Sequence, residues 1–487
     1  MIAGETKLVV PTGIRSTSPI PSHNGSFRVS FPTRTKRRRF GVPVSAANRV
    51  AVPENCTADE LHYVGVSGTE WKLALWRYLP SPKGERRNRP LLLLSGLGVN
   101  ALGFDLAPQS SFARHMSSKG FDTWILEIRG TGLSSVPVDS STQDNGTDLP
   151  NGNGVEMISR SGKRDSKFVE TFASLSERLS DHFEEGNNSF VASQIKGCSR
   201  EILTAMEEGR DSLPSQFLQE PFFASLDDFL KELDLLTKSD WDFDHCLQED
   251  LPAAMEYIRS QSRPKDGKMF AIGHSMGGIL LYAMLSRSCF EGRDSGLTSV
   301  TTLGSTLDYS SSKSLMKLLL PAADPAKALN IPAIPLGALA AALYPLVSSP
   351  PLSWLSHYVS SPGMLDPSLF EKLALNSVGT VPSKLLLQLS TAFQDGGLQD
   401  RSGSFYYKEH LRKCTVPVLA LAGDRDPVCP PEAVYETVKV IPRHLVTYRV
   451  LGKQNGPHFA HYDLVGSRLA VYQVYPIVVN FMRRHDT

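Results

Sequence analysis

The stretch Gly-His-Ser-Met-Gly-Gly at 273–278 constrains this chain most, because it separates two apolar runs of different length. The run before it, 269–272, has the length of a strand, and the run after it, 279–285, suits a helix. Glycines on both sides of Ser275 allow a tight strand-to-helix turn that larger side chains would block. Such a turn exposes the serine hydroxyl beside the first N–H groups of the helix. We therefore predict Ser275 to be a nucleophile.

Further short apolar runs predict a mainly parallel sheet. Two of them flank a Ser-Gly-Thr turn at 67–69 and should form a hairpin, while helix-like stretches at 251–260 and 279–286 separate several others. Strands that alternate with helices indicate an α/β fold. The expected strands are 61–66, 71–78, 91–94, 123–128, 269–272, 299–303, 418–422 and 445–451.

A carboxylate for the site is predicted in the loop 423–430, directly after an expected strand. A serine hydroxyl attacks efficiently when a histidine accepts its proton and a carboxylate orients that histidine. Glycine, aspartate and proline dominate this loop and can hold a carboxylate in a fixed position. Asp424 fits a cap of the following turn and helix better, so we favour Asp426 as the orienting acid.

The histidine is predicted in the loop 452–463, after the last expected strand. Two candidates are present, His458 and His461, and the order serine, aspartate, histidine along the chain is one that a nucleophilic serine can use. The position of the loop alone does not separate the two.

Backbone donors for a developing oxyanion are predicted at Leu97 and Met276. Leu97 lies in a glycine-bracketed turn, Ser-Gly-Leu-Gly at 95–98, directly after the expected strand 91–94. Its N–H and that of Met276 would lie beside the same oxygen. The alternative is that 95–98 is an ordinary turn between a strand and a helix.

The first 47 residues differ in composition from the rest. They hold eight Lys or Arg and a single acid, Glu5, so that without them the net charge of +1 becomes −6. This leader is rich in Ser, Thr and Pro and has no continuous apolar run, so we predict a transit peptide that is cut near 44–47. The expected destination is the plastid, and the alternatives are a mitochondrial or cytoplasmic protein. The alternative for the basic cluster 36–39 is a nuclear or membrane-surface patch. The acidic remainder gives no indication of nucleic-acid binding.

Two segments interrupt the α/β pattern. Residues 136–239 begin with a composition typical of disorder and are interpreted as a surface insert, with a functional lid as the alternative. Residues 307–410 are interpreted as an apolar helical cap, because 328–365 contain no Lys, Arg, Asp or Glu. Three prolines within 331–347 argue against a membrane-spanning helix there. A peripheral membrane contact or an ordinary cap core are the remaining interpretations.

The six cysteines show no metal-ligand spacing and no paired framework. We expect free thiols, including Cys429 beside the acid loop, which we interpret as structural. The cysteines are Cys56, Cys198, Cys246, Cys289, Cys414 and Cys429.

Together these motifs resemble the α/β-hydrolase superfamily, lipase- or esterase-like and of the plant plastid type, over 48–135, 240–306 and 411–487. The loop 423–430 resembles the family's Gly-x-x-Asp-x-x-x-Pro acid loop, which selects Asp426. His461-x-Asp463-x-x-Gly466 resembles the family's His-x-Asp form, which selects His461. The segments 127–134 and 241–254 also resemble family elements. Ser-Gly at 95–96 replaces the family's usual His-Gly.

The resemblance implies a serine ester hydrolase that needs neither metal nor cofactor. Ser275 would attack the carbonyl, His461 would carry the proton, Asp426 would orient His461, and the Leu97 and Met276 amides would bind the oxyanion. The uncharged segment favours an acyl-lipid or other hydrophobic ester. Acyl transfer by the same residues and a non-catalytic ligand-binding protein are the alternatives, and the oligomeric state stays open.

Overall fold

The computed structural model describes residues 56–136, 241–314 and 353–486, with a few positions between 317 and 344. The predicted leader, 1–47, lies outside the described residues. So do nearly all of the predicted insert, 136–239, and most of the apolar centre of the predicted cap, 331–347.

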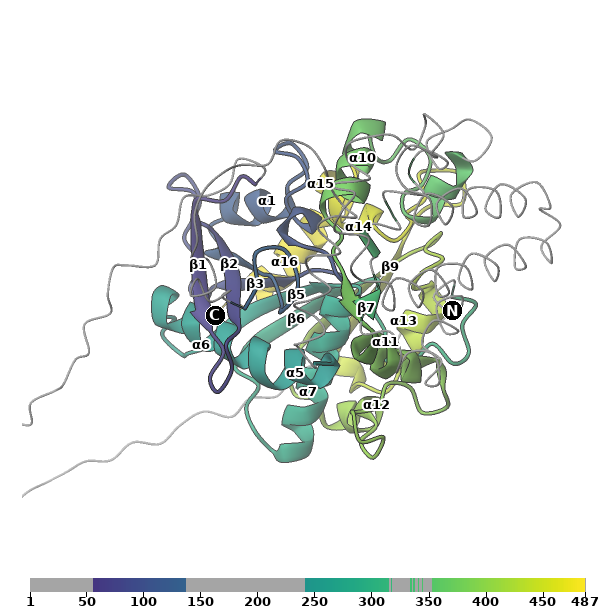
Figure 1. The fold of residues 1–487 in the computed structure, drawn as a ribbon. Helices are drawn as coiled ribbons and strands as arrows, with labels where there is room; N and C mark the ends of the chain where they lie inside the picture. Colours follow the sequence, from purple (N-terminus) through teal and green to yellow (C-terminus); the bar gives the residue numbers. More distant parts are fainter. Residues whose placement is uncertain are drawn as a thin grey trace, which may run out of the picture. The chain divides into compact units, whose positions relative to one another are not determined.

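The centre of the fold is an eight-stranded sheet in the order β1-β2-β4-β3-β5-β6-β9-β10 (Figure 1). Within it β2 pairs antiparallel with β1 and β4, and the other neighbours are parallel. All eight predicted strands are present, each bound lying within two residues of its prediction. They are β1 (Glu60–Gly65), β2 (Lys72–Tyr78), β3 (Leu91–Leu94), β4 (Thr123–Leu126), β5 (Met269–His274), β6 (Leu297–Leu303), β9 (Val418–Gly423) and β10 (Val446–Leu451).

Helices cover both faces of the sheet, which is why its central strands are apolar on both sides. In β3, Leu92 and Leu94 face one core cluster, and Leu91 and Leu93 face the other. The first cluster includes residues of α6 (Leu251–Ser262), α7 (Met276–Glu291) and α13 (Pro431–Val438). The second includes residues of α1 (Phe112–Ser118), α14 (Asp463–Gly466), α15 (Ala470–Gln473) and α16 (Tyr475–Arg484) (Figure 1). The expected α/β architecture is therefore confirmed.

Part of the 307–410 segment packs directly on this core. Its described helices are α10 (Pro367–Asn376), α11 (Ser383–Ser390) and α12 (Tyr407–His410), and β7 (Ala333–Ile334) pairs antiparallel with β8 (Val381–Pro382). Leu398, Phe405 and Tyr407 belong to the same buried cluster as α7. The later part of the segment thus buries apolar surface against the helix that follows Ser275.

In the part of the chain that the structure describes, no helix has the length and apolar character needed to cross a membrane.

Candidate active site

Ser275 stands at the turn between β5 and α7 in a conformation that is rare for a residue with a side chain. Its φ is 53° and its ψ is −122°. The Ser275 N–H donates to the Leu303 carbonyl at the end of β6, 3.0 Å away, and the side chain is half-buried. Such strain persists only where the surrounding structure imposes it, and it is what the strand-to-helix turn of the sequence prediction requires.

Three glycines make that turn sterically possible. A Cβ atom on Gly273 would lie 2.3 Å from the backbone of Gly277. One on Gly277 would lie 2.1 Å from the carbonyl oxygen of Leu94 in β3, and one on Gly278 would lie 2.2 Å from the Ser305 hydroxyl. None of these distances is compatible with a real side chain, so the glycine pattern reflects contact between the turn, β3 and the loop after β6.

Asp426 and His461 form a buried hydrogen-bonded pair. His461 Nδ1 lies 2.7 Å from Asp426 Oδ2, and Asp426 is 2% exposed. The other oxygen, Oδ1, accepts the N–H groups of Val428 at 2.9 Å and Cys429 at 2.8 Å. With Nδ1–H donated to the carboxylate, the other ring nitrogen, Nε2, is left as the proton acceptor.

Backbone contacts bring this pair to the end of the sheet where Ser275 lies. Gly304 directly follows Leu303, the residue that binds the Ser275 N–H. A Cβ on Gly304 would lie 3.0 Å from Asp426 Oδ2 and 3.1 Å from His461 Nδ1. Among the described residues neither the Ser275 hydroxyl nor His461 Nε2 has a hydrogen bond, as is common for catalytic groups before substrate binds.

The competing residues, Asp424 and His458, also form a pair. His458 Nδ1 donates to Asp424 Oδ2, and Asp424 Oδ1 accepts the Phe459 N–H at 2.9 Å. The side chains of His458 and Asp424 are 34% and 22% exposed. Those of His461 and Asp426 are only 11% and 0% exposed. The expected capping role of Asp424 was wrong: Asp426 makes the local turn contacts, and Asp424 bonds to the histidine loop.

The predicted oxyanion turn lies beside Ser275. A Cβ on Gly96 would lie 3.3 Å from the Ser275 Cβ. No hydrogen bond occupies the Leu97 or Met276 N–H within the described residues, so both remain available. The next residue, Gly98, has a φ of +66°, and its carbonyl accepts the Gly379 N–H at 2.9 Å. A segment of the predicted cap therefore holds the turn from outside.

Glu127 supports the short 3₁₀ helix that follows this turn, Ala101–Gly103, from inside the core. Its carboxylate accepts the N–H groups of Ala101 and Leu133, each at 2.8 Å. A Cβ on Gly132 would lie 2.3 Å from that carboxyl carbon, which explains the glycine. Burial raises the pKa of Glu127, and the two N–H donors oppose the rise. The motif at 127–134 is thus a structural support close to Ser275.

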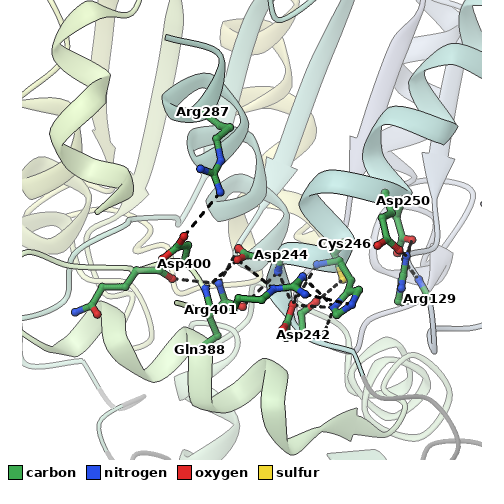
Figure 2. A network of polar contacts seen from close by, with 12 residues as sticks. Arg129, Asp242, Asp244, Cys246, Asp250, Arg287, Gln388, Asp400 and Arg401 are labelled. Atoms are coloured by element: carbon green, nitrogen blue, oxygen red, sulfur yellow. Dashed lines mark hydrogen bonds and ion pairs between the residues drawn. The ribbon is translucent and has the colours of Figure 1, made fainter. Parts of the chain in front are cut away.

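Arg129 and Asp250 form a buried ion pair next to this support (Figure 2). Arg129 Nε lies 2.8 Å from Asp250 Oδ1, and the Arg129 N–H donates to Oδ2 at 3.0 Å. The two side chains are 2% and 0% exposed. Asp250 ends the π-helix Cys246–Asp250, which continues into α6. The pair fixes the chain before α6 against the turn that follows β4.

Figure 2 also shows that Asp244 joins the core to the predicted cap. Its carboxylate accepts hydrogen bonds from the Gln388 amide at 2.7 Å, the Tyr407 hydroxyl at 2.6 Å and the Arg401 N–H at 2.9 Å. Arg287 of α7 forms an ion pair with Asp400 in the same network. These partners could not be identified from the sequence, because they lie more than 140 residues from Asp244.

Two further residues of the site were not assigned a role from sequence. His274 Nε2–H donates to the backbone carbonyl of His461, 3.2 Å away, and burial lowers the pKa of His274 well below 6.5. Asp463 is fully buried and accepts N–H groups from Ser361 at 2.7 Å and Ala460 at 2.8 Å. Both were part of motifs noticed in the sequence, but only their contacts show that they hold the His461 loop.

No cluster of three or more His, Cys, Asp or Glu suited to a metal ion is present among the described residues.

The chain belongs to the alpha/beta hydrolase fold family, whose model matches residues 89–463. The matched range includes Ser275, Asp426 and His461. A comparison with curated proteins finds no match.

Several solved structures are similar to this chain at low sequence identity. One is a soluble variant of monoglyceride lipase from Saccharomyces cerevisiae, with 13% identity over 90% of this chain and 99% of that chain, and a TM-score of 0.46. Another is an esterase from Thermogutta terrifontis, with 12% identity over 88% and 99% and a TM-score of 0.43. A membrane phospholipase A, described as a bacterial virulence factor, has 14% identity over 86% of each chain and a TM-score of 0.40. The family assignment rests on the sequence match.

Proposed function

We propose that this protein is a serine hydrolase that cleaves carboxylic esters, with Ser275 as the nucleophile. The observation that carries the proposal is the strained Ser275 turn at the same sheet edge as the buried His461–Asp426 pair. A hydrogen-bonded acid and histidine with a free Nε2 suit proton transfer to and from a serine. Family membership agrees with hydrolysis as the general class of reaction.

In the first half of the proposed reaction, Ser275 Oγ attacks the ester carbonyl while its proton moves to His461 Nε2. Negative charge develops on the carbonyl oxygen, which the Leu97 and Met276 N–H groups bind. Collapse of this intermediate breaks the ester C–O bond, and His461 gives its proton to the leaving alcohol. The products are the free alcohol and an acyl-serine.

In the second half, water attacks the acyl-serine and His461 accepts a proton from that water. Collapse of the second intermediate releases the carboxylic acid and returns the proton to Ser275 Oγ. Asp426 stays ionised throughout and stabilises the imidazolium form of His461 through the bond to Nδ1.

A hydrophobic acyl ester is the substrate class that we propose. The 328–365 segment contains no Lys, Arg, Asp or Glu. Strand β8, which pairs with β7 of this segment, lies against the oxyanion turn. A Cβ on Gly98 in that turn would lie 2.9 Å from the Val381 side chain. An apolar covering next to the reacting carbonyl favours an apolar acyl chain over a charged one.

The test uses 4-nitrophenyl esters of graded chain length and a fluorophosphonate probe. The native protein should release nitrophenol, prefer longer acyl chains and become labelled at Ser275. Ser275→Ala should lose both activity and labelling, whereas Ser260→Ala on the exposed side of α6 should keep both. Activity in the Ser275→Ala variant equal to that of the native protein would overturn the proposal.

A further inference from the structure

Asn100 caps two helices at once, directly after the predicted oxyanion turn. Its side-chain oxygen Oδ1 accepts the Leu102 N–H at 3.0 Å and so begins the 3₁₀ helix Ala101–Gly103. Its side-chain Nδ2 donates to the Asn376 carbonyl at 2.8 Å, and its backbone N–H donates to the Ser377 carbonyl at 2.9 Å. These carbonyls lie at the end of α10, where a helix has no partners of its own for them. Asn100 therefore ties the turn to α10.

The chain that follows α10 lies beside the turn like a short antiparallel strand. The Gly379 N–H donates to the Gly98 carbonyl at 2.9 Å, and Val99 forms an antiparallel bridge with Val378. Together with the bonds described above, these contacts fix the three residues that follow Leu97. They therefore set the position of the Leu97 N–H, one of the two proposed oxyanion donors.

The chain that precedes α10 holds the loop of the proposed base. The Ser360 hydroxyl donates to Asp463 Oδ1 at 2.5 Å, and the Ser361 N–H donates to Oδ2 at 2.7 Å. The Val359 carbonyl accepts the N–H of Tyr462, which directly follows the proposed base, at 2.9 Å. Both serines and the aspartate are buried, so water does not compete for these bonds.

One continuous stretch of chain, segment 359–379, joins these two sets of contacts. Its centre is α10, whose Leu373 lies in the same buried cluster as residues of α14, the helix that begins two residues after His461 (Figure 1). Lys372 Nζ also donates to the Leu106 carbonyl at 2.8 Å. Because a packed helix moves as a unit, a shift at one end of the segment reaches the other end.

We propose that segment 359–379 aligns the His461 loop with the oxyanion turn, and that Asn100 and Ser360 are the positioning residues at its two ends. The inference rests on the proposed ester hydrolysis, in which both loops act on the same carbonyl group. Asn100 and Ser360 act through the loops that they hold and not on the substrate.

Misalignment of either loop should slow the reaction without weakening substrate binding. The Leu97 N–H binds most strongly when charge has developed on the carbonyl oxygen, and His461 accepts its proton in the same step. A loss that is confined to the transition state lowers kcat and leaves KM nearly unchanged. A residue with a merely structural role would lower the melting temperature and would not change kcat in the folded protein.

Asn100→Asp tests the end of the segment at the oxyanion turn. The carboxylate keeps the acceptor for the Leu102 N–H, but it replaces the donor by a negative oxygen that faces the Asn376 carbonyl. We expect kcat for a 4-nitrophenyl ester to fall about tenfold or more, with KM within about twofold of the native value. Asn480→Asp, at an exposed position of α16, is the matched control and should behave as the native protein does. A native kcat in Asn100→Asp would overturn the role of Asn100.

Ser360→Ala tests the end of the segment at the histidine loop. Asp463 loses one hydroxyl donor and keeps the N–H groups of Ser361 and Ala460, so we expect a smaller fall in kcat, about three- to tenfold. Ser368→Ala, at an exposed position of the same segment, is the control. The double variant Asn100→Asp with Ser360→Ala should lose less than the product of the single losses, because both changes loosen one segment. Losses that multiply would show two independent contacts and contradict the proposal.

Hydrogen exchange measures the alignment without reference to catalysis. Asn100→Asp should accelerate amide exchange in the distant loop 459–466 as well as in the turn 98–103. Tyr462→Phe removes the direct bond from Tyr462 Oη to the Gly103 carbonyl, 3.1 Å long. Acceleration that persists in the Tyr462→Phe background is therefore carried by segment 359–379. Acceleration that stays confined to the turn would overturn the proposal.

The two experiments separate failure of this inference from failure of the proposed function. If the native protein hydrolyses no ester, the proposed function is wrong, and the exchange measurement still decides whether the segment couples the two loops. If the native protein is active and both variants keep its kcat, only this inference is wrong. Thermal melts show whether each variant is folded. Asn100→Ser, which keeps a capping oxygen without the donor, takes the place of an Asn100→Asp variant that does not fold.

Discussion

The imidazole ring of His274 packs against that of His461, with the ring centroids 4.6 Å apart. The two residues are 187 positions apart in the sequence, and His274 Nε2–H donates to the His461 carbonyl. Because His274 directly precedes Ser275, this contact ties the proposed nucleophile and the proposed base to one another through their backbones. It also keeps His274 neutral, since burial and the neighbouring His461 both lower its pKa.

Removal of this contact should impair alignment of His461. We expect His274→Ala to lower kcat for ester hydrolysis by about 10- to 100-fold with little change in KM. His274→Gln supplies an amide donor and should recover part of the loss. Steady-state kinetics on one 4-nitrophenyl ester measures both parameters, and an unchanged kcat in His274→Ala would contradict the positioning role.

The two aspartates of the acid loop should differ sharply in effect. Asp426→Asn is expected to lower kcat by about 10⁴-fold, because the amide cannot stabilise the imidazolium form of His461. Asp424→Asn, at the more exposed pair with His458, should keep kcat within about tenfold of the native value. Parallel kinetics and thermal melts of both variants separate a catalytic loss from unfolding. The reverse order of effects would assign the orienting role to Asp424.

Gly277→Ala tests the close packing of the Ser275 turn. Helix propensity alone predicts a gain of about 1 kcal/mol for this change. The collision with the Leu94 carbonyl predicts instead a loss of about 3 kcal/mol or more in the free energy of unfolding. Gly65→Ala, where no atom lies within 4 Å of the new Cβ, is the control and should be nearly neutral. Urea denaturation shows whether the free energy of unfolding of Gly277→Ala is higher or lower than that of the native protein.

Stability should fall as the pH drops below about 6.5. Burial and the nearby Lys119 lower the pKa of His115 to about 4. Burial lowers the pKa of His274 as well. A group whose pKa is lower in the folded state binds its proton preferentially in the unfolded chain, so acidification favours unfolding. The His115 contribution is complete above pH 6.5 and is lost toward pH 4. His115→Phe, which keeps a ring against Tyr475, should flatten the dependence of stability on pH over this range.

Arg129→Met should leave Asp250 buried without its partner. We expect a loss of about 3–5 kcal/mol in the free energy of unfolding, because an uncompensated buried charge is costly. The double variant Arg129→Met with Asp250→Leu should recover much of this loss. Arg293→Met breaks a far more exposed ion pair with Glu291 and should cost at most about 1 kcal/mol. Chemical denaturation of the four proteins provides the comparison.

Much of the fold could be predicted from local sequence. The strand predicted at 91–94 coincides with β3, Leu91–Leu94. It was predictable because four consecutive leucines suit a strand that is buried on both faces. The turn at Ser275 was also predictable, because its glycines report a backbone conformation that few residues allow. These features depend on a residue and its immediate neighbours.

Pairings between loops could not be predicted in the same way. Two aspartates and two histidines lie in consecutive loops, and sequence spacing does not state which acid bonds to which histidine. The structure joins Asp426 to His461 and Asp424 to His458, and only the first pair is buried beside Gly304. The order of β5, β6 and β9 in the sheet determines this burial, since it places the loop after β6 between Ser275 and the acid loop.

The sequence by itself determined the strands, the Ser275 turn and the identity of the residues available for proton transfer. Only the tertiary structure decided which of them meet, including the contact of His274 with His461 and that of His461 with Asp426. The physical reason is that strand and turn formation depends on local sterics and hydrophobic periodicity. Contacts between residues more than a hundred positions apart depend instead on the order in which the strands pair and on how the helices pack on them.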